Sequence, residues 1–236
     1  MNLDPSFIGT AFLSLLSALP VTLYITAVSV LGGLVIGTAI ALVRIYRVPV
    51  LYPAAVAYVT FIRGTPMLMH LFLVYFGLPA VLDTLADRYG WSFNSGSIPL
   101  VAFVIIAFSI TAGAYMSEVV RAGIGAVDRG QIEAAYAVGL TTAQALRRIV
   151  FPQAFAVSLP NLTNSVISML HATTLAFTIS VVEINAQANI VASTNWKFFE
   201  AYIAAALLFW GITVLVEKAS SALEKRFTLY NRGGVA

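Results

Sequence analysis

The chain has 236 residues, of which 60% are hydrophobic and 10% are charged, and its mean hydropathy is +0.91. Soluble domains carry about 25% charged residues, so a soluble chain of this length could not bury so much apolar surface. The composition indicates an integral membrane protein. The absence of cysteine excludes disulfides, thiolate metal sites and thiol nucleophiles. In a membrane protein the net charge of +3 reflects topology, and we expect no nucleic-acid partner.

The first apolar segment runs over about residues 12–43, which is longer than the roughly 20 residues that cross a bilayer. It is either one tilted span or a span preceded by an interfacial helix before Pro20. Gly32, Gly33 and Gly37 lie on or near one helical face, where small residues let two helices approach closely. We expect these glycines to serve helix packing.

The second apolar segment, about residues 48–78, is too long for one straight crossing. Prolines open it and Arg63-Gly64-Thr65-Pro66 interrupts it, so we expect an elbow along the inner interface over 49–62 and the true span over 64–79. Arg63 would then lie at the cytoplasmic boundary, where a guanidinium can reach water or a partner. A loop is expected over 80–97 and the third span over 98–120.

The loop 121–152 is the longest polar interruption in the chain. Within it, Glu133-Ala134-Ala135, Gly139 and Pro152 predict two short helical pieces with a turn at the glycine, which tolerates positive φ. Such a segment is either an ordinary surface helical hairpin or a docking element for a partner. Between two membrane spans, we expect the second.

The fourth span, expected over 155–182, is the most polar, and the fifth is expected over 198–218. Residues 183–197 are expected to form an outer loop, in which Glu183 either contacts a partner or is a solvated helix cap. Lipid does not solvate polar side chains, so those of the fourth span must face protein or water. These side chains are Asn161, Thr163, Asn164, Ser165, Ser168, His171, Thr173, Thr174 and Thr178.

Five spans place the two termini on opposite sides of the membrane. With the N-terminus outside and the C-terminus cytoplasmic, the outer side receives only Arg88 and Lys197 of the loop and tail cations. We therefore predict an all-α integral membrane fold, with residues 1–236 as one transmembrane domain. The cytoplasmic side receives Arg44, Arg47, Arg121, Arg129, Arg147, Arg148, Lys218, Lys225, Arg226 and Arg232.

Several motifs occur in the order in which one transporter family has them. The spacing Glu-Ala-Ala-x₃-Gly-x₉-Ile-x-x-Pro over 133–152 resembles the EAA loop of ABC importer permeases. FIRGTPMLMHLF over 61–72, YFGLP over 75–79, GAYMSEVVRAG over 113–123 and FPQA over 151–154 resemble the polar amino acid uptake family. The resemblance covers roughly residues 10–230, and the motifs together are far more specific than any one of them.

The resemblance implies the permease fold of a type I ABC importer in the bacterial cytoplasmic (inner) membrane. The implied partners are a dimer of ABC ATPase subunits, a second permease copy or paralogue, and an extracytoplasmic solute-binding protein. The EAA loop would be a coupling helix on the ATPase. No GxxxxGK[ST] phosphate loop occurs, so ATP and Mg would belong to the partner ATPase and this chain would be no enzyme. The implied coupling residues are Glu133, Ala134, Ala135, Gly139, Arg147 and Pro152.

Two departures from the family bear on the solute. His70 stands where the family often has glutamine, and Leu170-His-Ala-Thr-Thr-Leu175 stands where it often reads Leu-Lys-Asp-Thr-Ser-Leu. The missing Lys-Asp pair leaves a neutral or unusual zwitterion, such as cystine, a glutamine-like amino acid or ectoine, as open as a basic amino acid. His171 either meets the solute or hydrogen-bonds to a neighbouring helix.

The candidate substrate-pathway residues are polar side chains of the spans. A second group, Arg63, Glu118 and Arg121, forms either a structural pair or a gate, because Glu118 and Arg121 lie one helical turn apart. No catalytic or metal-binding cluster is expected, since the two histidines are far apart without carboxylates at ligand spacing. The pathway candidates are His70, Thr111, Tyr115, Asn164, Ser168, His171, Thr173 and Thr174.

The alternative function is an ion-coupled secondary transporter or a channel. The odd number of spans, the lack of a visible inverted repeat and the large polar loop disfavour it. A membrane-embedded enzyme is disfavoured because no nucleophile–base pair or ligand cluster is visible.

Overall fold

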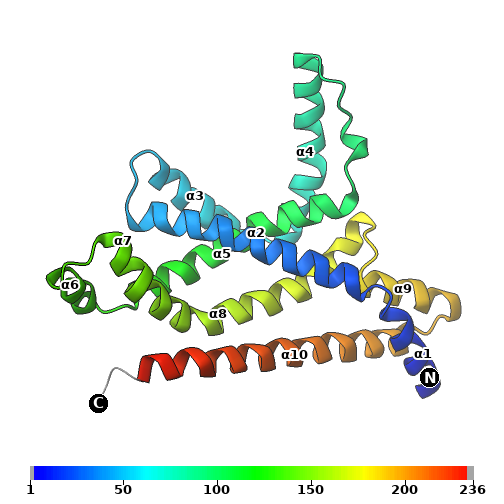
Figure 1. The fold of residues 1–236 in the computed structure, drawn as a ribbon. Helices are drawn as coiled ribbons and strands as arrows, with labels where there is room; N and C mark the ends of the chain where they lie inside the picture. The colour runs from blue at the N-terminus through cyan, green and yellow to red at the C-terminus, as the bar shows by residue number, and fades with distance from the viewer. Residues whose placement is uncertain (1–2, 233–236) are drawn as a thin grey trace.

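The computed structural model describes residues 3–232, and every regular element in that range is helical (Figure 1). The short elements η1 and η3 are 3₁₀-helical, and η2 is a π-helical turn. The elements in chain order are α1 Pro5–Leu15, α2 Leu19–Ile45, α3 Leu51–Gly64, α4 Met67–Tyr89, η1 Ser95–Ser97, α5 Leu100–Gly125, α6 Arg129–Ala137, α7 Thr142–Ala145, η2 Leu146–Val150, α8 Phe151–Ala172, η3 Thr173–Ile179, α9 Ile184–Asn195 and α10 Phe198–Arg232.

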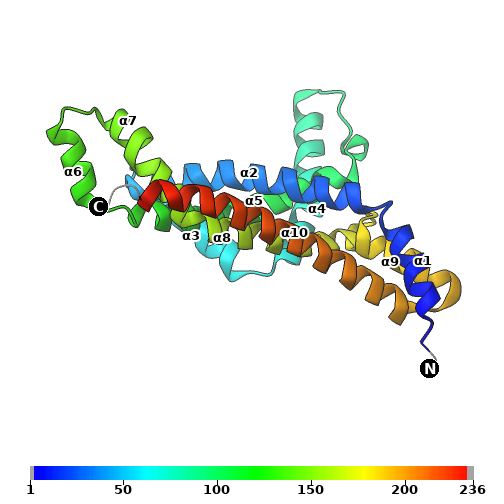
Figure 2. The ribbon, with the colours of Figure 1, turned by 60° about the horizontal axis from the view of Figure 1, so that its bottom comes forward.

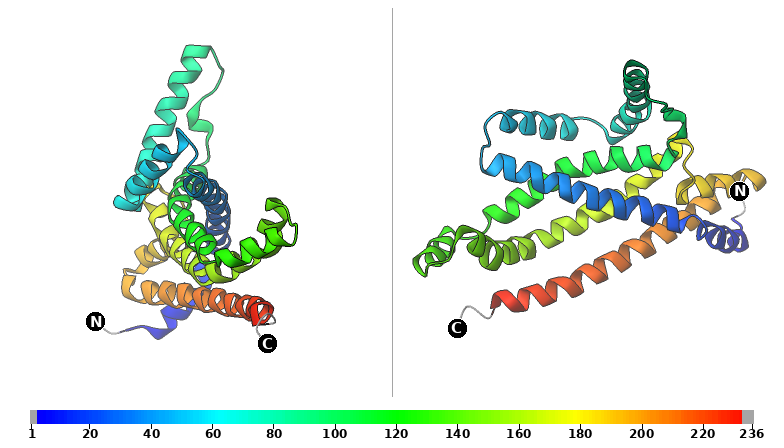
Figure 3. Two further views of the ribbon diagram at one scale, coloured as in Figure 1. Left: turned by 90° about the vertical axis from the view of Figure 1, so that its left-hand side faces the viewer. Right: turned by 45° about the horizontal axis from the view of Figure 1, so that its top comes forward.

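The prediction of five spans is confirmed, because five helical stretches of the described chain are long and apolar enough to cross a membrane. The start of α1 and the last turns of α10 lie at opposite ends of the molecule (Figures 1 and 3). The α2–α3 turn and the helices α6 and α7 lie at the same end as the last turns of α10. The five stretches are Leu19–Ile45, Met67–Tyr89, Leu100–Gly125, Thr142–Ile179 and Phe198–Phe227.

The glycines of α2 let it pack directly on α5. A Cβ added to Gly33 would lie 2.4 Å from the Cβ of Ala112, and one added to Gly37 would lie 2.9 Å from the backbone oxygen of Gly113. Real Cβ atoms do not approach so closely, so a larger residue at either position would force the helices apart. The packing role expected for Gly33 and Gly37 is what the geometry shows.

The N-terminal segment is two helices and not one long span. Asp4 caps α1 by accepting hydrogen bonds from the backbone N–H groups of Ser6 and Phe7, and α1 ends at Leu15, before Pro20. Lys197 bonds to the Asp4 carboxylate and holds its pKa below the usual range. Of the two arrangements considered for residues 12–43, the structure has a short separate helix followed by a span.

The predicted outer loop 183–197 contains a twelve-residue helix, α9, so its description as a loop was wrong. Ile184, Ala188 and Ala192 recur at every fourth position and are buried against α1 and α10. Small side chains on this face let α9 lie close to both helices. The segment between the fourth and fifth spans is therefore a packed part of the fold.

The second span extends well beyond its predicted end at residue 79. Pro79 lies inside α4, which continues to Tyr89 and ends where Gly90 adopts a left-handed conformation. A proline removes one backbone hydrogen bond without always ending a helix. The C-terminal half of α4 stands away from the other helices in every view (Figures 1, 2 and 3). The elbow expected over 49–62 is present as α3, at Leu51–Gly64.

The loop 121–152 contains the expected helical pieces and the expected turn. Gly139 has a φ of +80° between α6 and α7, in the region that glycine enters without steric cost. Thr141 and Gln144 form a reciprocal capping box at the start of α7. The second piece does not end before the fourth span, because α7, η2 and α8 follow one another without a break.

Candidate functional site

A cavity of about 400 Å³ opens between α5 and α8 beside the α3–α4 junction. Four candidate pathway residues line it: Thr111 and Tyr115 from α5, and Asn164 and Ser168 from α8. Their hydroxyl and amide groups can donate and accept hydrogen bonds, so the cavity suits a small polar solute. The remaining lining residues, which were not among the pathway candidates, are Thr65, Met67, Ala112, Ser165 and Met169.

His70 lies behind the cavity wall and not in it. The side chain is buried, with Nε2 2.6 Å from the Thr65 hydroxyl and Nδ1 3.0 Å from the Thr111 hydroxyl. Both threonines line the cavity, so His70 ties the start of α4 to α5 and orients two lining side chains. Its position makes it a positioning residue.

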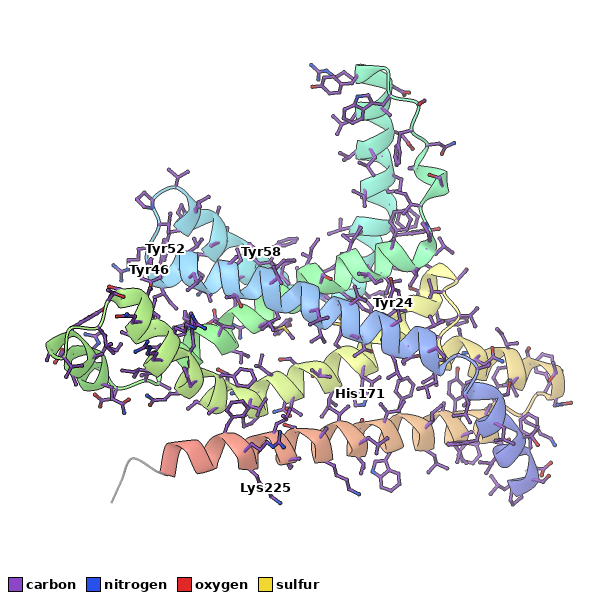
Figure 4. All side chains as sticks on the ribbon, in the orientation of Figure 1. Tyr24, Tyr46, Tyr52, Tyr58, His171 and Lys225 are labelled. Carbon is purple, nitrogen blue, oxygen red and sulfur yellow. The ribbon has the colours of Figure 1, made fainter. Side chains whose placement is uncertain are left out.

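His171, Thr173 and Thr174 do not line this cavity. His171 Nε2 lies 3.3 Å from the Thr213 hydroxyl of α10, in the gap between α8 and α10 that Figure 4 shows. Thr173 is buried, and both threonines donate to backbone oxygens three residues earlier. His171 thus contacts a neighbouring helix and its side chain remains exposed, so its contact with the solute stays a prediction.

Glu118 is the centre of an ion-pair cluster one turn beyond the cavity-lining Tyr115. Its Oε1 accepts from Arg44 at 2.6 Å and lies 3.7 Å from Arg63, and its Oε2 accepts from Arg121 at 2.7 Å. The Arg63 guanidinium also lies 5.8 Å from the centre of the Tyr115 ring. The cluster joins α2, α3 and α5 next to the cavity. The sequence indicated the Glu118–Arg121 pair, but Arg44 was missed.

The candidate coupling residues lie at one end of the molecule on exposed helices. Glu133 and Ala134 are exposed on α6, whereas Ala135 is buried. Arg147 is exposed on η2, and Pro152 lies in the first turn of α8. Tyr136 and Val138 are large apolar side chains that remain exposed beside Gly139, so this surface can accept a partner. The predicted coupling residues thus all lie in one helical unit, which runs from α6 to the start of α8.

This helical unit is anchored to the bundle by a small apolar cluster. Val127, Val150 and Ala154 are buried together, and the Gln153 side chain donates to the side-chain oxygen of Gln131. A Cβ added to Gly123, near the end of α5, would lie 1.9 Å from the hydroxyl oxygen of Ser158 in α8. The loop is therefore fixed to both α5 and α8, so displacing it would displace both walls of the cavity.

Glu183 caps α9 between the fourth and fifth spans. Its carboxylate accepts hydrogen bonds from the backbone N–H groups of Asn185 and Ala186, and the side chain is fully buried. Burial raises its pKa to about 7, against the lowering effect of those two hydrogen bonds. The cap is buried and not solvated. Among residues 3–232, no group of three His, Asp or Glu side chains could hold a metal ion.

Comparison with known proteins identifies relatives over nearly the whole chain. The family described as "binding-protein-dependent transport system inner membrane component" matches residues 33–229. The L-cystine transport system permease protein TcyL of Bacillus subtilis (strain 168) is 39% identical over 223 residues, covering 94% of this chain and 91% of the relative. The probable amino-acid ABC transporter permease protein PatM of Vibrio harveyi is 37% identical over 218 residues, covering 92% and 93%.

A solved structure shares the fold. The crystal structure of an amino acid ABC transporter with histidines contains a chain that superposes with a TM-score of 0.80 at 34% identity. The match covers 96% of this chain and 100% of that chain. The helical arrangement is thus shared from end to end.

Proposed function

We propose that this chain, which belongs to the family of binding-protein-dependent transport system inner membrane components, moves an amino acid or an amino-acid-like solute inward as the permease subunit of an ATP-driven importer. The family consists of multi-pass inner-membrane subunits, and ATP is hydrolysed in a separate ATPase subunit, so the chain is not itself an enzyme. The observation that carries the proposal is the pairing of an uncharged cavity among the spans, lined by hydroxyl, amide and apolar groups, with an exposed helical unit fixed to both cavity walls.

The exposed unit from α6 to the start of α8 would dock on an ABC ATPase dimer. The apolar side chains of Tyr136 and Val138 would enter the ATPase surface, with Glu133 and Arg147 as polar contacts and Ala134 as a further apolar contact. Gly139 sets the angle between α6 and α7 through its positive φ. ATP and Mg would be bound by the ATPase. Its closure would move α5 and α8 relative to each other and so open the cavity to alternate sides.

The rest of the assembly follows from transport in one direction. An extracytoplasmic binding protein would deliver the solute, and a second permease, identical or paralogous, would complete the pathway. We place the N-terminus outside and the C-terminus in the cytoplasm, because this orientation puts most of the Lys and Arg side chains of the loops inside.

The cavity favours a small zwitterion as the solute. Its lining side chains are hydroxyls, one amide and apolar groups, and none of them carries a charge. A neutral amino acid such as cystine or a glutamine-like solute would therefore find hydrogen bonds without a buried unpaired charge. The relative TcyL carries a name that states L-cystine transport, which agrees with this class.

The test is ATP hydrolysis by the permease reconstituted with its ATPase and binding protein, across a panel of amino acids. We expect hydrolysis that rises with one solute class, and we expect Glu133→Ala to abolish solute transport while the chain still inserts. Glu217→Ala, which removes an exposed carboxylate from α10, is the matched control. Uptake that follows a proton or sodium gradient without any ATPase would refute the proposal in favour of a secondary transporter.

A further inference from the structure

A second pocket lies at the end of the molecule where α2 turns into α3. Its volume is about 370 Å³, and it is lined by the last turn of α2, the turn itself, the start of α3 and the end of α5. It is separate from the cavity between α5 and α8, and it shares no lining residue with it. The lining residues are Arg44, Ile45, Arg47, Tyr52, Arg121, Ile124 and Gly125.

The pocket carries more positive charge than the single carboxylate of Glu118 can neutralise. Arg44 and Arg121 occupy opposite oxygens of the Glu118 carboxylate, which also has Arg63 3.7 Å from one of them. One negative charge thus faces three guanidiniums. Arg47 adds a further positive charge to the lining and makes no ion pair among residues 3–232. An anion with several acceptor oxygens would match the planar donor groups of these arginines.

The surroundings of the pocket place it at the edge of the apolar layer. Arg44 is in the last turn of the α2 span, and α3 then runs back beside α2. Tyr46 and Tyr52 flank the turn in Figure 4, and aromatic side chains of this kind concentrate at membrane–water interfaces. Val50 and Leu51, at the tip of the turn, are large apolar side chains exposed by 85% and 54%. Such side chains suit contact with acyl chains and not with water.

We propose that this pocket binds the phosphate headgroup of an anionic phospholipid from the surrounding leaflet. The phosphate oxygens would accept from Arg47 and from the N–H groups of Arg44 and Arg121 that do not bond to Glu118, with the Tyr52 hydroxyl beside them. The acyl chains would lie along the apolar residues at the start of α3. Free phosphate has the same charge chemistry, but it would leave the exposed apolar rim without a partner. Basic pockets between membrane helices recognise lipid headgroups in this way.

A bound headgroup would share its arginines with Glu118. Because Arg63 of this cluster lies over the cavity-lining Tyr115, the lipid site is connected to the cavity through Glu118, Arg63 and Tyr115. The lipid would supply the negative charge that the protein itself lacks around Glu118. Retention of anionic lipid should therefore depend on the arginines of the pocket and not on the net charge of the chain.

The experiment measures lipid retained by the full-length permease, purified from mixed phosphatidylglycerol and phosphatidylcholine vesicles, by native mass spectrometry. We expect preferential retention of phosphatidylglycerol, and a loss of about five-fold in Arg47→Gln, which corresponds to about 1 kcal/mol for one arginine near the surface. Arg148→Gln is the matched control, because it removes the same charge from an exposed position at the same end of the molecule, outside the pocket lining. Its retention should equal that of the wild type.

Three results would overturn the proposal. Equal phosphatidylglycerol retention in Arg47→Gln and the wild type would show that the pocket does not hold the headgroup. An equal loss in Arg148→Gln would reduce the effect to net charge. Stoichiometric binding of inorganic phosphate by lipid-free protein, with displacement of retained lipid at millimolar concentration, would make the site a free-anion site. Loss of a co-purified ATPase in Arg47→Gln with unchanged lipid would make it a protein contact, which also refutes the lipid assignment.

Discussion

The buried Glu183 should make the stability of this protein depend on pH in the opposite sense to an ion-paired carboxylate. Its pKa rises from the ordinary value of 4.5 to about 7 in the folded chain, so the folded state holds the proton more tightly than the unfolded state. Below the unfolded pKa the protonated side chain costs nothing. As the pH rises through the folded pKa, ionisation destabilises the folded chain, by about 3 kcal/mol in total above pH 7.

Replacing Glu183 by glutamine should remove this dependence. Glutamine cannot ionise, and its single side-chain oxygen can still accept from one of the two backbone N–H groups, of Asn185 or Ala186, which bond to different oxygens of Glu183. We expect the unfolding temperature of the wild type in detergent to fall between pH 5 and pH 8.5 by more than that of Glu183→Gln.

Glu217→Gln provides the control, since it removes an exposed carboxylate from α10. Its unfolding temperature should follow the wild type at every pH. Parallel curves for the wild type and Glu183→Gln would refute the reasoning, because they would mean that the proton on Glu183 is bound equally in the folded and unfolded chains.

The remaining predictions concern the helix contact, the coupling turn and the two histidines. Gly33→Ala should lower the free energy of unfolding by about 1–3 kcal/mol through a clash with α5. Gly77→Ala, with no atom within 4 Å of the new Cβ, should raise this free energy by up to about 1 kcal/mol. Chemical denaturation measures both changes. Gly139→Val should abolish solute-stimulated ATP hydrolysis, because a β-branched residue is strained at a φ of +80°, and Gly139→Asn should retain more of it. His70→Phe should weaken solute binding several-fold by releasing the two threonine hydroxyls that it holds, and His171→Phe should change binding less, since His171 contacts α10; equal losses in the two variants, measured by transport kinetics, would contradict this assignment.

The number and order of the spans could be predicted from the sequence because long apolar runs have few alternatives in a membrane protein. Helix boundaries were harder to predict where a residue type, such as proline, occurs both at helix ends and inside helices. The second span was expected to end at residue 79, but α4 continues through Pro79 to Tyr89. The helix α9 was missed although its signals are present, namely Glu183 as a capping residue and Ile184, Ala188 and Ala192 at every fourth position. A short helix between two spans does not show as an apolar run.

The candidate site residues, too, could be predicted from the sequence only in part. The candidates Asn164, Ser168 and His171 recur at three- and four-residue spacing in the fourth span, but only Asn164 and Ser168 line the cavity, whereas His171 contacts α10. Spacing identifies the residues that share a helical face and does not identify what covers each turn of that face. The pairing of Arg44 with Glu118 depends on how α2 packs on α5, and 74 residues separate the two positions. No local pattern in a single sequence contains that information.

The ion-pair cluster and the helix packing together define which parts of the protein can move as one body. The close contacts at Gly33 and Gly37 fix α2 to α5 along their length, and the Arg44–Glu118 pair fixes the same two helices at one end. Interfaces that cannot stretch transmit displacement instead of absorbing it. A force applied to α6 therefore reaches the cavity through both α5 and α8, and α2 moves together with α5.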